Sequence, residues 1–499
     1  KNLTFRNNMT YDNVKSTNSP YGSFREYATL NPYYPYQDEN GNYLKELEAN
    51  SGILGRKSVI NPLYNTTLNV IDETSYSEFA NNFGIDWYIN ADLRLKGNFA
   101  IRHKKNDGTV FKPADHTDFV NYSDDNYYRR GYYQATSGKE FFYDGNVVLS
   151  YFKQIQDHTL NANIAWNIQG NEGEVYTVRA EGFPDEKLDF ITFAAQNAKE
   201  YLPTGEDYIS RLMGFVGNAG YTYRDCYLLD ASIRFDGSSK FGSDGRWATF
   251  WSVGLGWNIH NEHFLEGAGW LDMLKLRASV GNPGNQNFDA YIAMKIYTYN
   301  NHHTNPWGVS AIINNFGNPD LEWQKTLDRN IGLDLVVFNN RLRMNFDYFS
   351  KKTDPLLVYT GVPSSTGGTS VPANVGGQVT KGYTVVLNYA LLKKEHLLWQ
   401  VNATLRHLTS EYRNVSAYLS RFNDENKTKN MLRYYDGGSP SDLWAVRSAG
   451  IDAATGREIF LHKDGTQSFA YNVEDEVVVG NSDPKLEGVV GMSFYYKGF

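Results

Sequence analysis

Apolar and polar residues alternate along most of the chain with a period of two. In residues 93–103 one alternate set is apolar and the other carries charges or amides: Leu93, Leu95, Phe99 and Ile101 against Arg94, Lys96, Asn98 and Arg102. Successive side chains of a β-strand point to opposite faces, so this pattern predicts a strand with one apolar face. The pattern recurs in residues 160–168, 229–235, 247–259, 274–280, 327–337, 342–348, 383–391, 399–405 and 490–496.

The links between the predicted strands are alternately short and long. Short links lie near residues 88–91, 154–158, 223–225, 339–341 and 393–396. Long links cover roughly residues 15–80, 105–140, 170–209, 282–325 and 410–484. Tight turns at one end and long loops at the other are typical of outer-membrane barrels, whereas long loops are uncommon in compact soluble domains. We count about fourteen strands, the first running outward from the periplasm.

An apolar stripe opposite polar side chains fits two all-β architectures. In a soluble β-sandwich the polar face meets solvent, and in a wide barrel it meets a hydrated or plugged lumen. The alternation itself does not separate the two, but the alternating link lengths favour the barrel. Tryptophans near the predicted strand ends fit the interfacial girdles of a barrel or the core of a sandwich. They are Trp87, Trp166, Trp251, Trp257, Trp323 and Trp399.

The composition agrees with a strand-built membrane protein. Aromatic residues make up 15% of the 499 residues, yet the mean hydropathy is only -0.53. No run of about 18 apolar residues occurs, which excludes a helical membrane protein. Alternating strands conceal their apolar face from such averages. The net charge of -8 argues against nucleic acid as a partner, and the single cysteine excludes an internal disulfide framework.

Residue patterns for catalysis or for bound cofactors are weak. Asp124-Asp125 and the acidic run 474–476 supply the paired carboxylates of a glycosidase, but such runs are usually solvated loop surfaces. His302 and His303 are adjacent and are not spaced for chelation from one side of an element. Phosphate-binding GxxxxGK[ST] and dinucleotide-binding GxGxxG motifs are missing from the sequence. We expect no enzyme activity, no metal and no cofactor.

Short motifs in a fixed order resemble a known family. They are Leu274–Gln286 (LKLRASVGNPGNQ), Gly317–Lys325 (GNPDLEWQK), Asp347–Asp354, Asn374–Gly377, Gly450–Gly456 and Gly480–Lys485, with Phe83–Ile89 and Arg129–Gly131 upstream. Together they are similar to the SusC/RagA family of TonB-dependent transporters in the outer membranes of Bacteroidota. Pro283 stands where the family usually has a threonine-containing stretch, and residues 377–380 vary its usual pattern.

The resemblance implies a transmembrane antiparallel β-barrel of about 22 strands in the full protein. About fourteen of those strands would be covered here, so residues 1–499 would form part of a single TonB-dependent-receptor β-barrel domain. The family's N-terminal plug domain is expected before residue 1, and further strands are expected after residue 499.

The resemblance also implies active import of oligosaccharides across the outer membrane. A SusD-like surface lipoprotein would capture the substrate, and TonB would act through the plug; two transporter–lipoprotein pairs would associate. Import of oligopeptides, as in RagA-like members, is the nearest alternative. A soluble β-sandwich that binds carbohydrate is an alternative of another class, and the barrel pattern alone also fits a passive porin.

Aromatic residues in the long links are the candidate substrate contacts. Aromatic rings stack on the apolar faces of sugars, and carboxylates or amides bind the hydroxyl groups. The same rings would otherwise pack within the loops or contact the lipoprotein. The candidates are Tyr33, Tyr34, Tyr36, Tyr127, Tyr128 and Trp307.

Overall fold

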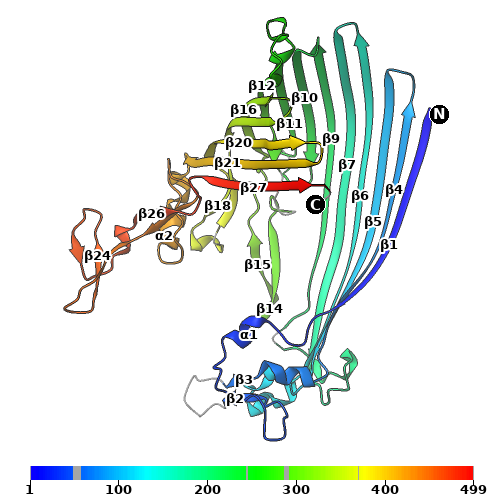
Figure 1. The fold of residues 1–499 in the computed structure, drawn as a ribbon. Coiled ribbons are helices and arrows are strands. Elements are labelled where there is room, and N and C mark those ends of the chain that lie inside the picture. Colours follow the sequence, from blue (N-terminus) through cyan, green and yellow to red (C-terminus); the bar gives the residue numbers. More distant parts are fainter. Residues whose placement is uncertain are drawn as a thin grey trace.

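A large antiparallel sheet dominates the computed structural model, which describes residues 2–48, 58–199, 201–242, 245–285, 291–368 and 370–497. Fourteen of its sixteen strands form one continuous path in chain order, confirming the predicted number of strands. The path curves around a hollow (Figure 1). It comprises β1 (Leu3–Thr17), β4 (Ile71–Tyr88), β5 (Leu93–Lys112), β6 (Tyr132–Ile155), β7 (His158–Glu181), β9 (Thr204–Tyr223), β10 (Tyr227–Ser238), β11 (Trp247–Asn258), β12 (Leu271–Asn282), β16 (Gln324–Val337), β17 (Leu342–Thr353), β20 (Gly377–Lys394), β21 (Leu397–Arg413) and β27 (Glu487–Tyr496).

The register aligns the apolar alternate positions of neighbouring strands on one face, which we call the outer face. Phe83 of β4 lies opposite Phe99 of β5, and its ring stacks on that of Phe5 with centroids 6.1 Å apart. These side chains stay accessible: Phe5 is 60% exposed and Ile164 is 69% exposed. A β-sandwich would bury its apolar face in a core. The soluble sandwich alternative is therefore wrong.

Two neighbouring groups of strands in the middle of the sheet differ in length. Strands β4, β5, β6, β7 and β9, here called the tall wall, have 18 to 24 residues. Strands β10, β11, β12, β16 and β17, the low wall, have 12 to 14 residues. A transmembrane strand needs about 9 to 11 residues. The low wall therefore matches a bilayer, and the tall wall rises well beyond it.

The extra length of the tall wall lies toward the long loops, because its strands meet at tight turns at the other end. The apolar band on β4 runs from Trp87 to Phe79, and Ser77 and Ser75 follow it on the same face. On β7 the band gives way to Glu172 and Glu174. The strands therefore continue into residues that the sequence analysis assigned to long loops. Polar side chains on both faces of these strand ends hide the alternation there.

Tight turns join the strands where the sequence predicts them. Arg224 and Asp225 between β9 and β10 both have φ of 51°, and Asn339 and Asn340 between β16 and β17 have φ of 54° and 58°. Asparagine and aspartate enter this left-handed region more readily than most residues do. In the described ranges, no helix is both long and apolar enough to cross a membrane.

The long loops carry small elements of their own at the opposite end (Figure 1). An arm built around α2 (Ser416–Asn426), β22 (Asp442–Ala445) and β26 (Val477–Asn481) projects from the sheet. Further elements in the described ranges are α1 (Phe24–Ala28), β2 (Glu46–Glu48), β3 (Val59–Ile60), β8 (Gln196–Asn197), β13 (Gly284–Asn285), β14 (Ile296–Asn305), β15 (Gly308–Asn315), β18 (Leu357–Gly361), β19 (Ser370–Asn374), β23 (Arg447–Ile451), β24 (Glu458–Leu461), β25 (Gln467–Ser468) and short 3-10 helices.

Candidate functional site: the inner wall of the barrel

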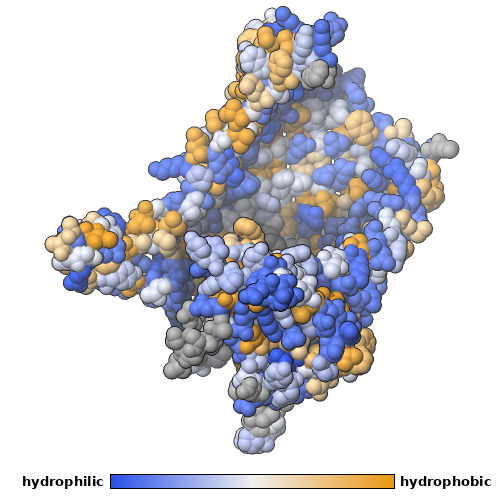
Figure 2. All heavy atoms as spheres, turned by 60° about the horizontal axis from the view of Figure 1, so that its bottom comes forward, coloured by the Kyte–Doolittle hydropathy of each residue, from blue (hydrophilic) through white to orange (hydrophobic). Residues whose placement is uncertain are grey.

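The alternate positions opposite the apolar band form a polar inner face. Figure 2 looks toward the hollow from the loop end of the molecule. The register places residues of one kind in rows across the strands: Asn163 of β7 lies opposite Asn218 of β9, and their side-chain amides are 2.7 Å apart. Ser232 of β10 lies opposite Ser252 of β11, with hydroxyls 2.7 Å apart. The inner face therefore offers hydrogen-bonding groups rather than an apolar lining.

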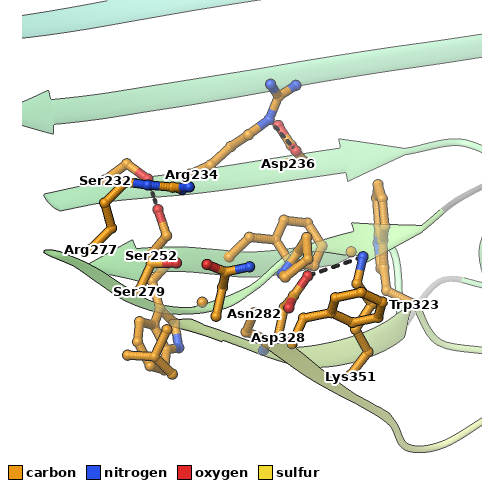
Figure 3. A pocket seen from close by; sticks show the side chains of 18 residues that line it. Ser232, Arg234, Asp236, Ser252, Arg277, Ser279, Asn282, Trp323, Asp328 and Lys351 are labelled. Atoms are coloured by element: carbon orange, nitrogen blue, oxygen red, sulfur yellow. Dashed lines mark hydrogen bonds and ion pairs between the residues drawn. The ribbon is translucent and has the colours of Figure 1, made fainter. Parts of the chain in front are cut away.

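A cavity of about 820 Å³ lies against the inner face of the low wall (Figure 3). Hydroxyl, amide, carboxylate and cationic side chains line it together with aromatic residues. The lining includes Ser232, Arg234, Asp236, Phe250, Ser252, Arg277, Ser279, Asn282, Trp323, Asp328, Asn330, Phe349 and Lys351. Such a mixture suits a polar ligand that has both hydrogen-bonding groups and apolar faces.

The charged groups of this cavity are paired on the protein. Arg234 donates to Asp236 two residues along β10, and Lys351 Nζ lies 3.3 Å from Asp328 Oδ2 across β16 and β17. Asp236 is only 5% exposed. Its Oδ1 atom has no hydrogen-bond partner among the described residues. A buried acceptor without a partner costs about 1–3 kcal/mol, so this atom needs a water molecule or a donor from another group.

Glycines on the inner face let charged side chains meet across a strand. Arg277 of β12, Gly332 of β16 and Asp347 of β17 lie in one row. A Cβ atom on Gly332 would stand 2.7 Å from Arg277 Cζ and 2.7 Å from Asp347 Oδ1. The glycine thus leaves room for Arg277 to reach Asp347 at 3.0 Å while its Nε lies 2.9 Å from Asp334 Oδ2.

Trp323 differs from the other tryptophans that were assigned to a girdle. Trp87, Trp166 and Trp251 lie on the outer face with about two-fifths of their surface exposed (41%, 39% and 41%). Trp323 is 3% exposed and packs against Phe241 and Phe250, and its Nε1 donates to the Arg246 carbonyl at 3.2 Å. It precedes β16 directly and closes the loop end of the low wall. The prediction of an interfacial Trp323 is wrong.

The six aromatic candidates from the sequence all lie in loops outside this cavity. Tyr33 and Trp307 are 91% and 92% exposed, and Tyr36 is about half exposed. Tyr34 donates its hydroxyl to Glu48 Oε2 at 2.5 Å, which holds it within its own loop. None of the six appears among the residues that line the cavity in the described part of the chain. Their role in substrate contact stays a prediction.

Tyr127 and Tyr128 belong to a third loop, where both meet cations. The Arg130 guanidinium lies 3.5 Å from the Tyr127 ring centroid, and Lys199 Nζ lies 3.2 Å from the Tyr128 hydroxyl. The inner-wall residues Asp236, Arg277 and Asp328 were not among the sequence candidates. The alternation covered Arg277 and Asp328 but ended before Asp236, and only the register between strands shows which residues are neighbours.

The curved antiparallel sheet, its apolar outer band and its polar inner face together are typical of the wall of a transmembrane β-barrel. Residues 3–461 match the family described as "TonB dependent receptor-like, beta-barrel", and the chain belongs to that family. Members of this family are outer-membrane transport proteins and not enzymes. The predicted family, barrel fold and outer-membrane location are thereby confirmed.

The chain spans less than half of the length of the curated relatives it matches. The chain is 28% identical to TonB-dependent receptor P39 of Formosa agariphila over 78% of its own length and 36% of the relative's. It is 26% identical to TonB-dependent receptor SusC of Bacteroides thetaiotaomicron over 83% of its own length and 39% of the relative's. All of this chain superposes on a solved structure of the RagAB peptide transporter and covers 55% of the matched chain of that structure. The TM-score is 0.84 at 21% sequence identity. That likeness shows the fold alone.

Proposed function

We propose that the protein imports oligosaccharides across the outer membrane in a TonB-dependent manner, and that residues 1–499 supply part of the wall and the outer loops of its single barrel domain. The paired charges of the inner wall are the observation that carries this proposal. Arg102–Glu140, Arg277–Asp334 and Lys351–Asp328 lie 3.3, 2.9 and 3.3 Å apart. Such pairs balance the charge at these positions and keep the wall polar, which suits a neutral ligand rich in hydroxyl groups.

The proposal assigns the partners that similar transporters imply. A SusD-like lipoprotein would capture the sugar above the loops, and exposed rings such as Tyr33 and Trp307 would contact the sugar or that lipoprotein. TonB would act through a plug domain inside the barrel. Two transporter–lipoprotein pairs would associate in the membrane.

Import of oligopeptides is the second candidate. The similarity in fold to a peptide transporter supports this candidate. The amide and hydroxyl rows of the inner face would also bind a peptide backbone. The two candidates differ in the ligand, because a sugar offers clustered hydroxyls and C–H faces whereas a peptide offers amides and charged ends.

Binding and uptake measurements on the full-length protein test the proposal. The transporter is purified in detergent with whatever lipoprotein accompanies it, and neutral oligosaccharides and mixed oligopeptides of matched length are titrated calorimetrically. We expect saturable binding of at least one oligosaccharide class, and uptake by cells that disappears when TonB is deleted. Binding of peptides alone would replace the first candidate with the second. Uptake that persists without TonB would contradict active import and favour a passive pore.

A further inference from the structure

A second hollow lies on the inner face of the tall wall, beyond the apolar band and toward the loops. It has a volume of about 650 Å³ and is bounded by β1, β4, β5, β6, β7 and β9. Ser77 and Ser75 lie on the outer face at its level, so it stands above the membrane-spanning part of the wall. A ligand from outside would therefore meet it before the low-wall cavity.

Small residues form the floor of the hollow. Gly138 of β6 lies in a row between Asn106 of β5 and Val175 of β7, and Gly108 of β5 lies opposite Thr136 of β6. A Cβ atom on Gly108 would have its nearest neighbour, the Thr136 Cβ atom, at 3.6 Å. A Cβ atom at Gly108 would thus fit in ordinary contact with its neighbours.

Two tyrosines stand on either side of this floor. Tyr76 on β4 and Tyr208 on β9 are half-buried, and their strands are four spacings apart, or about 19 Å. Tyr208 lies over Gly173 of β7, with ring atoms 2.7 Å from the position of a Cβ atom there, so its ring leans toward the floor. Lys104 Nζ lies 4.3 Å from the Tyr76 ring centroid and fixes one side of that ring.

Hydrogen-bonding groups without excess charge complete the lining. Glu140 points into the hollow from β6 and is bound by Arg102 at 3.3 Å. Asn106 and Gln134 add amide groups. The hydroxyls of Thr136 and Thr177 lie 3.0 Å apart across β6 and β7. Acceptors and donors therefore surround a shallow floor that has a tyrosine at each side.

We propose that this hollow binds a short stretch of the transported oligosaccharide, and this inference rests on the proposed function. The C–H faces of its sugar rings would pack on Tyr76 at one side and on Tyr208 at the other, and their hydroxyls would bond to Glu140, Asn106 and Gln134. The site gives the tall wall a role in binding, since it holds the ligand above the membrane and on one side of the lumen.

The test fills the hollow and compares it with an equally open glycine elsewhere. Gly108→Val places two methyl groups over the floor. Gly254→Val on β11 is the matched control, since the nearest neighbour of its Cβ atom would stand at 3.9 Å, against 3.6 Å at Gly108. Both variants of the full-length protein are titrated calorimetrically with the oligosaccharide that the wild type binds. We expect Gly108→Val to weaken binding about tenfold, and Gly254→Val to leave it within about twofold.

Tyr208→Ala provides a second variant that cannot fail through crowding, and it should also weaken binding about tenfold. Folding of each variant is checked by the heat-dependent gel mobility of intact barrels. Wild-type affinity in both Gly108→Val and Tyr208→Ala would overturn the inference while leaving oligosaccharide import intact. Failure of the wild type to bind any oligosaccharide would overturn the proposed function and this inference together. If the wild type binds peptides and Gly108→Val and Tyr208→Ala lose that binding, the hollow binds peptides and not sugars.

Discussion

A buried ion pair anchors an outer loop to the end of β7, and its loss has a calculable effect. Arg129 Nε lies 2.7 Å from Glu181 Oε1 and Arg129 Nη2 lies 3.2 Å from Glu181 Oε2. Gln196 also donates to the same carboxylate, at 2.6 Å. The two charged side chains are only 9% and 7% exposed. The pair links the loop of residues 113–131, which carries Tyr127 and Tyr128, to the end of β7, and Gln196 joins the loop after β7 to the same carboxylate.

Arg129→Met removes the cation and leaves the Glu181 carboxylate buried. Breaking one side of a buried pair costs about 3–5 kcal/mol, because the remaining charge has no counterion. If that cost falls on local opening, amide hydrogens in residues 182–203 should exchange roughly a hundredfold to several thousandfold faster. Hydrogen exchange followed by mass spectrometry measures this, with the tight turns at the other end as an internal reference.

The matched control removes both charges. Arg129→Met with Glu181→Leu has no uncompensated buried charge, so most of the lost protection should return. Burial by itself raises the pKa of Glu181, but the bonds from Arg129 and Gln196 outweigh it and hold the pKa below its usual value. A lowered pKa gives stability that is present above the unfolded pKa and lost as pH falls. The difference in hydrogen-exchange protection between wild type and Arg129→Met should therefore become smaller at acidic pH. Equal exchange in the single and double variants would refute this reasoning.

Three further changes test other parts of the molecule. Phe99→Arg on the outer face should lower the free energy of unfolding in lipid vesicles by about 2–4 kcal/mol, whereas Asn98→Arg on the inner face should lower it much less. Equal losses would contradict the assignment of faces. Gly332→Val should lower the unfolding free energy by about 1–3 kcal/mol, because its Cβ atom collides with Arg277; an unchanged denaturant midpoint would count against that packing. Trp323→Ala should cost about 3–5 kcal/mol by emptying a buried site, whereas a girdle position would cost far less.

Much of the membrane-spanning wall is predictable from the sequence because the two solvents on its faces differ. Phe99 and Ile101 face lipid while Asn98 and Arg102 face a polar lumen, and this contrast produces the period of two. The tight turns are predictable for a local reason, since Asn339-Asn340 adopts the left-handed conformation that such a turn requires.

The upper wall and the site are less predictable because their determinants are not local. Ser77, Lys105 and Glu172 face water beyond the apolar band, so the hydrophobic contrast disappears although the strand ladder continues. The approach of Arg277 to Asp347 depends on the register of three strands and on the glycine between them. Neither feature leaves a periodic signal in the sequence.

The central claim is that the period-two pattern sorts side chains between lipid and a hydrated lumen. Single spin labels at successive positions from Leu95 to His103 on β5, in the full-length protein reconstituted in vesicles, test it most directly. The account predicts that collision with oxygen is high at odd positions, such as Phe99 and Ile101. Collision with a water-soluble paramagnetic reagent should be higher at even positions, such as Asn98 and Ala100. Accessibility without this alternation, or with the phases reversed, would contradict the account.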